Sequence, residues 1–144
     1  MELPDPAPGL VIGYAYLWRD EAARGLEEGR KDRPCVIVLS VQTVESRAVV
    51  TVAPITHTPR GRPDQAVEIP AATKARLGLD SGRSGIIASD LNRFIWPGVD
   101  LRPIARGSQR YDYGLLPSDL FRQVRDKILR LARTGRAAMT ARNS

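Results

Sequence analysis

Two short apolar runs joined by a polar segment constrain the fold of this chain more than any other feature. Residues 35–39 and 48–55 are both rich in valine and isoleucine, a composition typical of strands in the buried core of a sheet. A residue that such a core does not need stands beside each run. Arg33 comes just ahead of Pro34, and Thr56 follows the second run directly. These two side chains are therefore the first candidates for chemistry.

The remaining segments predict a mainly β fold, β with α, built from short antiparallel strands. Proline and glycine separate five further strand-like segments: 10–17, 66–69, 85–89, 91–96 and 99–103. A short internal helix is predicted at 71–77, ending at Gly78. A longer C-terminal helix is expected from Ser118, its natural cap, with an apolar stripe to lay across the sheet. That stripe comprises Leu120, Phe121, Val124, Ile128 and Leu131.

The chain length and the distribution of these segments predict one domain. We expect an extended, proline-rich arm at 1–9, a single domain at 10–134 and a mobile tail at 135–144. Residues 18–32 are charged and punctuated by glycine, which predicts a long loop. In that loop Glu21 and Glu28 are expected to be solvated.

Charge and cysteine usage narrow the possible partners and cofactors. The net charge of +6 and the pI near 10.1 suit a polyanion such as nucleic acid, an acidic protein, or merely a solubilised surface. The single cysteine, Cys35, excludes an internal disulfide and is interpreted as a small core residue. Nucleotide-binding and zinc motifs do not occur in the sequence, so we predict no cofactor and no metal. No long apolar run or signal peptide pattern occurs either, which favours a cytoplasmic protein with no membrane contact.

The ordered pattern RPCVIVLS at 33–40 and PIT at 54–56 resembles the MazF and PemK family of ribosome-independent, RNA-cleaving toxins. Arg33 and Thr56 are 23 residues apart, as in that family. The likeness extends over 8–131, with a Gly-x-Glu loop, the segment SGIIASD at 84–90 and a C-terminal helix. The resemblance implies an SH3-like, partly open antiparallel β-barrel that forms a homodimer. It also implies a type II toxin that cleaves single-stranded RNA without metal and binds a cognate antitoxin, whose acidic segment occupies the RNA groove.

The resemblance assigns Arg33 and Thr56 to the active site. RNA can be cut by its own 2′-hydroxyl, leaving a 2′,3′-cyclic phosphate and a 5′-hydroxyl, provided that the protein supplies proton transfer and charge stabilisation. His57 is the only histidine, so a histidine pair within one chain is excluded. Arg33 offers a planar fork of donors to phosphate oxygens, and Thr56 offers a hydroxyl. Glu27, at the place of the family's loop glutamate, and His57 are then the available proton acceptors.

Further cations and one aromatic residue form the predicted RNA-binding set, with a solvated surface as the alternative for each. The set comprises Arg24, Arg30, Lys31, Arg60, Arg62, Arg83 and Tyr111. Asp90 occupies the position of a family Asp-Gln pair, but Leu91 replaces the glutamine. A strand-end aspartate more often binds its own backbone, so we predict a structural role for Asp90.

Two alternatives from another functional class are a gyrase poison of the CcdB type and a catalytically silent member that binds only RNA or antitoxin. Gyrase poisons of that type depend on an aromatic and apolar C-terminus, whereas this chain ends in Arg142, Asn143 and Ser144. That ending counts against the first alternative, and the second stays open.

Overall fold

Strands β2 (Asp32–Gln42) and β3 (Ala48–Thr56) lie at the centre of the sheet, as the two apolar runs predict. A computed structural model describes residues 3–25, 31–43, 45–57 and 63–142. β2 and β3 pair antiparallel, with Cys35 opposite Pro54 and Gln42 opposite Ala48. Arg33 and Thr56 therefore lie at the same end of the sheet.

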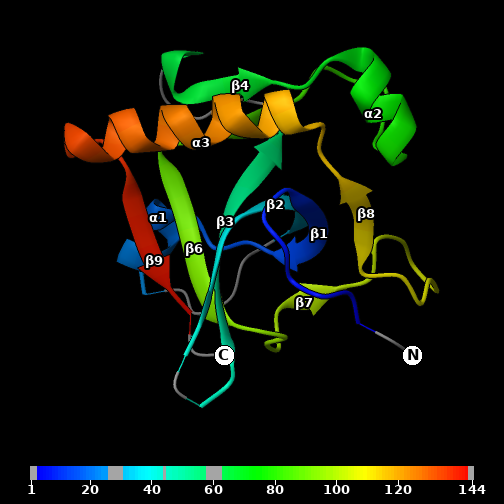
Figure 1. Ribbon diagram of the computed structural model, residues 1–144, viewed down its shortest axis with the longest axis horizontal. Helices are drawn as coiled ribbons and strands as arrows, with labels where there is room; N and C mark the ends of the chain where they lie inside the picture. The colour runs from blue at the N-terminus through cyan, green and yellow to red at the C-terminus, as the bar shows by residue number, and fades with distance from the viewer. Residues whose placement is uncertain (1–2, 26–30, 44, 58–62, 143–144) are drawn as a thin grey trace.

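Nine strands within the described residues form one sheet that does not close into a ring (Figure 1). The hydrogen-bonded path runs β4-β5-β3-β2-β1-β7. β3 is shared, because β6 pairs with its first half and β5 with its last two residues. The other strands are β1 (Leu10–Ala15), β4 (Ala66–Glu68), β5 (Gly85–Ile87), β6 (Asp90–Ile95), β7 (Leu101–Arg102), β8 (Asp112–Leu115) and β9 (Ala138–Ala141). The prediction of a mainly β, partly open antiparallel fold with a short internal helix and a C-terminal helix is confirmed.

Residues 35–37 of β2 and 50–55 of β3 are covered on both faces of the sheet, which explains why these stretches are apolar. Cys35 and Ile37 of β2 pack into one cluster with Tyr14, Tyr16 and Phe94. Their neighbours point to the opposite face, where a second cluster forms beneath the C-terminal helix. That second cluster includes Val36, Ala53, Ile55, Leu116, Leu120 and Val124. Cys35 is fully buried, as predicted.

The helices cover the second cluster and one edge of the sheet. α3 (Ser118–Arg133) lies across the sheet with Leu120, Val124 and Leu131 buried. α2 (Ala71–Leu77) ends at Gly78, whose φ of 74° is the left-handed conformation that favours glycine. A 3-10 turn, η1 (Pro63–Gln65), precedes β4. Ser118 is the first residue of α3 and not, as predicted, its cap. The cap position is occupied by Pro117, and no side-chain hydrogen bond caps the helix.

The charged segment before β2 is more ordered than predicted. Residues 19–23 form a short helix, α1 (Arg19–Ala23), where a loop is expected. The Glu21 carboxylate accepts a hydrogen bond from the backbone N–H of Trp18, 3.0 Å away, and the residue is buried. The prediction that Glu21 is solvated is therefore wrong, since its carboxylate satisfies a donor at the start of the helix. Glu28 lies outside the described residues.

Two strands near the C-terminus were not expected. No strand is predicted from the sequence at 112–115, where β8 lies and pairs with β1. β9 pairs in parallel with β6, so the prediction of a mobile tail is wrong for residues 138–141. Only Thr140 in this strand is of the β-branched or aromatic type that is typical of strands, so the composition does not predict a strand. The strand is held in place by Arg142, whose guanidinium forms a buried ion pair with Asp100 at 2.8 Å.

Candidate functional site

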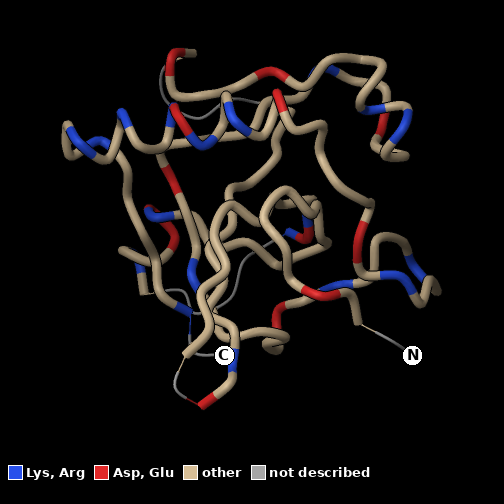
Figure 2. Tube along the Cα trace, viewed as in Figure 1, with Lys and Arg blue, Asp and Glu red and all other residues tan. Residues whose placement is uncertain are grey.

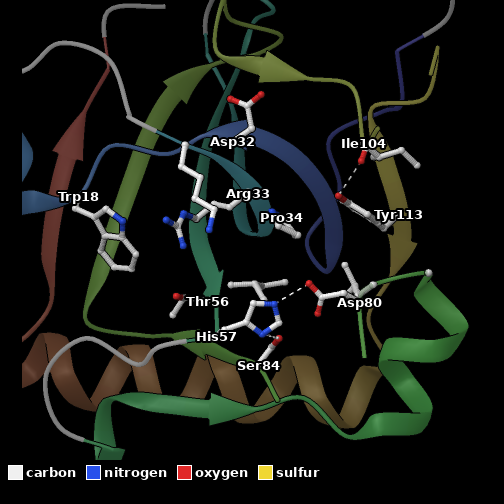
Figure 3. A pocket seen from close by; sticks show the side chains of 14 residues that line it. Trp18, Asp32, Arg33, Pro34, Thr56, His57, Asp80, Ser84, Ile104 and Tyr113 are labelled. Carbon is white, nitrogen blue, oxygen red and sulfur yellow. Dashed lines mark hydrogen bonds and ion pairs between the residues drawn. The ribbon is translucent and has the colours of Figure 1, made fainter. Parts of the chain in front are cut away.

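A pocket of about 630 Å³ opens where β2 begins and β3 ends (Figure 3). Arg33 comes from β2, and Thr56 and His57 come from the end of β3 and the residue after it. Lys31 also lines the pocket. The antiparallel pairing of β2 with β3 thus brings together four predicted site residues that are up to 26 positions apart in the sequence.

Arg33 has an environment that leaves its charge available. Its guanidinium lies over the Trp18 ring, 5.1 Å from the ring centroid, which attracts the cation without neutralising it. The Nε atom is buried and donates to no acceptor within the described residues. No carboxylate among those residues forms an ion pair with Arg33. Asp32, its neighbour in β2, instead pairs with Arg102 at 3.6 Å.

Thr56 is the last residue of β3 and is half-buried, opposite Gly85 of β5. Pairing with β5 fixes the backbone at this point. Figure 3 shows the Thr56 and Arg33 side chains on the same wall of the pocket. A hydroxyl and a guanidinium held in this way can both donate to one phosphate group.

His57 has both ring nitrogens directed at protein oxygens. Nδ1 lies 2.8 Å from the carbonyl oxygen of Arg83, and Nε2 lies 2.7 Å from a carboxylate oxygen of Asp80. A carbonyl can only accept, as can an ionised carboxylate, so the arrangement fits an imidazolium that donates from both nitrogens. The Arg83 carbonyl and then the Asp80 carboxylate raise the pKa of His57. His57 as a proton acceptor, which the sequence predicts, is disfavoured by this arrangement.

Lys74 of α2 organises the segment that holds His57, a role that no sequence pattern predicts. Although it lies on a helix, its side chain is only 5% exposed and its ammonium lies 3.1 Å from Asp80 Oδ1. It also donates to the carbonyl of Gly82 and to the hydroxyl of Ser84. The three donors of a buried ammonium are thus satisfied. Hydrogen bonds from His57 and Lys74 hold the pKa of Asp80 below its usual range.

The opposite side of the pocket is apolar and aromatic. Pro34, Leu79, Ile104 and Tyr113 line it. The Tyr113 hydroxyl donates to the Ile104 carbonyl at 3.3 Å, and burial raises the pKa of this phenol. A wall of this kind beside a cationic wall suits a ligand with a planar apolar part and an anionic part.

The other predicted site residues are distributed around the pocket or lie outside it. Arg83 lines an adjoining hollow and forms a bidentate pair with Glu68, at 2.6 and 3.3 Å. Arg24 follows α1 and lies 3.9 Å from Asp20. Tyr111 is half-buried against the first core cluster. Glu27, Arg30, Arg60 and Arg62 lie outside the described residues.

Asp90 has the structural role that the sequence favours, through different partners. Its two carboxylate oxygens accept from the Tyr16 hydroxyl at 2.5 Å and from the backbone N–H of Arg19 at 3.1 Å. It therefore joins β6 to the start of α1, rather than binding its own backbone. Burial, followed by the neighbouring Asp90 carboxylate, raises the pKa of Tyr16.

Comparison with known protein families identifies the region of the chain that contains Arg33 and Thr56. The family model of PemK-like, MazF-like toxins of type II toxin-antitoxin systems matches residues 17–95, more than half of the chain. This chain belongs to that family. The match includes Arg33, Thr56, His57 and the Lys74 network, so the whole cationic wall of the pocket is part of the PemK/MazF toxin region.

Solved structures resemble this PemK/MazF chain in fold. One is a crystal structure of MazE-MazF (Form-II) from Deinococcus radiodurans, with a TM-score of 0.50 and 19% identity over 92% of this chain and 97% of that one. Form-III of MazE-MazF from the same organism has a TM-score of 0.51 and 17% identity over 94% of this chain and 100% of that one. A comparison with individually curated protein sequences gives no match. Among the described residues, no helix combines the length and the apolar character needed to cross a membrane.

Proposed function

We propose that this PemK/MazF toxin is a metal-independent endoribonuclease that cleaves single-stranded RNA and thereby inhibits growth. The observation that carries the proposal is the guanidinium of Arg33, which lies beside Thr56 in an open pocket with no carboxylate partner among the described residues. A cation left in this state at a pocket wall is suited to an anionic ligand. The apolar wall opposite, with Tyr113, suits a base of the same RNA.

Cleavage uses the 2′-hydroxyl of the RNA as the nucleophile. Its oxygen loses a proton and attacks the adjacent phosphorus, and the bond to the 5′-oxygen of the next nucleotide breaks. The leaving 5′-oxygen takes up a proton from water, so a 2′,3′-cyclic phosphate and a 5′-hydroxyl result. Arg33 and Thr56 bind the non-bridging oxygens, where negative charge increases in the transition state. When His57 donates from both ring nitrogens, it adds positive charge to the wall and has no lone pair for the 2′-proton. Glu27 therefore remains the predicted proton acceptor.

The active protein is proposed to be a cytoplasmic homodimer that a cognate antitoxin inhibits. Three apolar side chains are exposed on the two strands that flank β3: Leu39 and Val41 of β2 and Ile95 of β6. Val49 of β3 lies between Val41 and Ile95 in the register, so they form one continuous strip. An exposed apolar strip of this kind is typical of an interface. A monomer in light scattering at micromolar concentration would contradict this part of the proposal.

The antitoxin is proposed to place an acidic segment in the RNA pocket. The two similar structures are both named as MazE-MazF, and the basic charge of this chain suits an acidic partner. Antitoxin and RNA should then compete for Arg33. Simultaneous, independent binding of the two would exclude a shared pocket.

The test of the proposed activity is the chemistry of the cut ends. Purified protein is incubated with a long single-stranded RNA in EDTA, and the fragments are mapped. We expect cleavage to persist and to give 5′-hydroxyl ends that polynucleotide kinase labels without prior phosphatase treatment. The matched substrate carries a single 2′-deoxynucleotide at the mapped site and should not be cut there. Cleavage of that substrate, or 5′-phosphate ends, would show a different nuclease chemistry, and RNA bound without cleavage would indicate a silent member.

A further inference from the structure

The C-terminal half of α3 and the residues after it carry a concentration of positive charge that the active-site proposal does not use. Lys127, Arg130, Arg133 and Arg136 line one hollow of about 480 Å³, together with a single carboxylate, Asp64. Figure 2 shows lysine and arginine along this part of α3. We call these four cations the α3 groove.

Ordinary helix stabilisation and ion pairing account for only part of the α3 groove. Cations in the last turn of a helix favour the helix dipole, but the effect falls off beyond that turn. Lys127 lies before the last turn, and Arg136 lies after the end of the helix. Asp64 pairs with Arg136 at 3.5 Å, and both side chains are about half exposed. No described carboxylate pairs with Arg130 or Arg133, and both residues are exposed.

A path of three hollows leads from the Arg33 pocket towards the α3 groove, with the segment 63–66 between the second hollow and the groove. His57 and Ser84 line both that pocket and a second hollow of about 420 Å³, which also includes Arg83. Pro63 and Ala66 border the second hollow, while Asp64, between them in sequence, borders the α3 groove. The Lys127 ammonium donates to the carbonyl of Ala66 at 3.4 Å. One short segment, 63–66, therefore separates the second hollow from the α3 groove.

We propose that the α3 groove binds the sugar-phosphate backbone of single-stranded RNA that extends beyond the Arg33 pocket. The inference rests on the proposed function, since an RNA cut within its length must continue past the pocket. Three of the four cations are arginines, whose planar forks match phosphate oxygens. They lie where the path from the catalytic pocket leads, so one strand can contact both places. Contacts of this kind add affinity and salt dependence without reading sequence.

The test compares two charge removals on one helix. Arg130→Gln/Arg133→Gln removes two cations from the α3 groove. Arg122→Gln/Arg125→Gln removes two from α3 where neither side chain lines any of the three hollows. The probes are fluorescent 2′-O-methyl RNAs of 20 and 4 nucleotides, in which the attacking hydroxyl is blocked. Binding is measured by fluorescence anisotropy at salt concentrations from roughly 50 to 200 mM, the range over which phosphate contacts weaken strongly.

The groove variant should bind the 20-mer on the order of tenfold more weakly than the wild type, with a salt slope shallower by about 1.4, which corresponds to two lost phosphate contacts. Its affinity for the 4-mer should not change, and the control variant should resemble the wild type with both probes. Equal losses in both variants, or an equal loss for both probes, would overturn the proposal. So would a groove variant that binds the 20-mer normally but loses an acidic peptide, because the groove would then be a protein site. If the wild type cleaves RNA while the groove variant binds the 20-mer normally, only this inference fails. If the wild type neither binds nor cleaves RNA, the proposed function fails as well.

Discussion

Two arginines at different places in the sheet sit over aromatic rings, yet their surroundings differ. Arg33 lies 5.1 Å from the centroid of Trp18, and Arg142 lies 5.5 Å from that of Tyr14. Arg142 is 2% exposed, pairs with Asp100 and donates to the carbonyl of Ala15 and to Asn92, at 2.9 and 3.1 Å. Arg33 borders an open pocket, and its buried Nε has no acceptor within the described residues.

The difference shows how partners determine the role of a charged side chain. The donors of Arg142 face protein oxygens, so this arginine attaches the C-terminal strand β9 to the core. Arg33 has a similar aromatic support but no carboxylate partner among the described residues, and it can therefore supply its donors to a ligand. A buried charge whose partner is removed is costly, whereas an open charge can be removed with little effect on folding. Stability and activity should therefore respond in opposite ways to the two arginines.

The largest expected effect is on stability, from Arg142→Met. The substitution leaves the Asp100 carboxylate buried without its cation, which should cost about 3 to 5 kcal/mol of unfolding free energy. Urea denaturation measures this loss. Below the transition, RNA cleavage per folded molecule should stay close to the wild-type rate. The double variant Asp100→Asn/Arg142→Met should recover much of the stability, and a double variant as unstable as the single one would show that the ion pair is not the cause.

The converse substitution, Arg33→Ala, should affect activity and leave folding nearly unchanged. Loss of a donor to the charge that develops on phosphate should cost about 3 to 4 kcal/mol of transition-state stabilisation, which is a hundredfold to thousandfold in rate. Cleavage of a labelled RNA and the melting temperature are measured together. Arg33→Lys keeps the charge but not the planar fork and should retain intermediate activity. A well-folded Arg33→Ala protein with full activity would remove the basis for the proposed site.

The position of Arg33 can be predicted from the sequence because it depends on strands that are close together in the chain. Residues 35–37 of β2 and 50–55 of β3 are covered on both faces, so their apolar composition alone indicates buried strands. Antiparallel pairing of two such neighbours places Arg33 and Thr56 at one end. The limits of α2 follow equally well, since Gly78 can adopt the left-handed conformation that ends the helix.

The Arg142 side could not be predicted, because its interactions are long-range. β9 has only one β-branched residue, Thr140, and forms a strand through its pairing with β6. Arg142 is positioned by Asp100, which is 42 residues away. The Lys74 network is hidden for the same reason, because a lysine on a short helix is normally exposed. A lysine six residues before an aspartate, as at 74 and 80, is too common a spacing in sequences to indicate a site. The residues that hold His57 therefore became visible only in three dimensions.

A smaller effect on the rate of RNA cleavage is expected from substitution of Thr56. This substitution tests whether a second side chain in the Arg33 pocket contributes to cleavage. Thr56→Val keeps the shape of the side chain and removes its hydroxyl, so cleavage should fall about tenfold, as for one neutral hydrogen bond of about 1.4 kcal/mol. Single-turnover cleavage of the labelled RNA measures the loss. Thr56→Ser restores the hydroxyl and should restore most of the rate. If the serine variant is as slow as the valine variant, the methyl group and not the hydroxyl is what matters.

The smallest expected effect is a change in the pKa of His57. Both ring nitrogens of this residue, like the donors of Arg142, face acceptors of the protein. The Arg83 carbonyl and the Asp80 carboxylate raise its pKa above the ordinary value of about 6.5. Their stabilising contribution should be complete below that ordinary value and disappear as the pH rises through the raised pKa.

His57 is the only histidine, so its Cε1 proton gives a single NMR titration curve. Asp80→Asn should lower this pKa without abolishing the whole shift, because the Arg83 carbonyl remains. Glu68→Gln removes a carboxylate that Arg83 binds and that does not contact the ring, so it should leave the curve in place. A wild-type pKa at or below the ordinary value would show that His57 keeps a free lone pair, and it would restore this residue as a proton acceptor in the reaction.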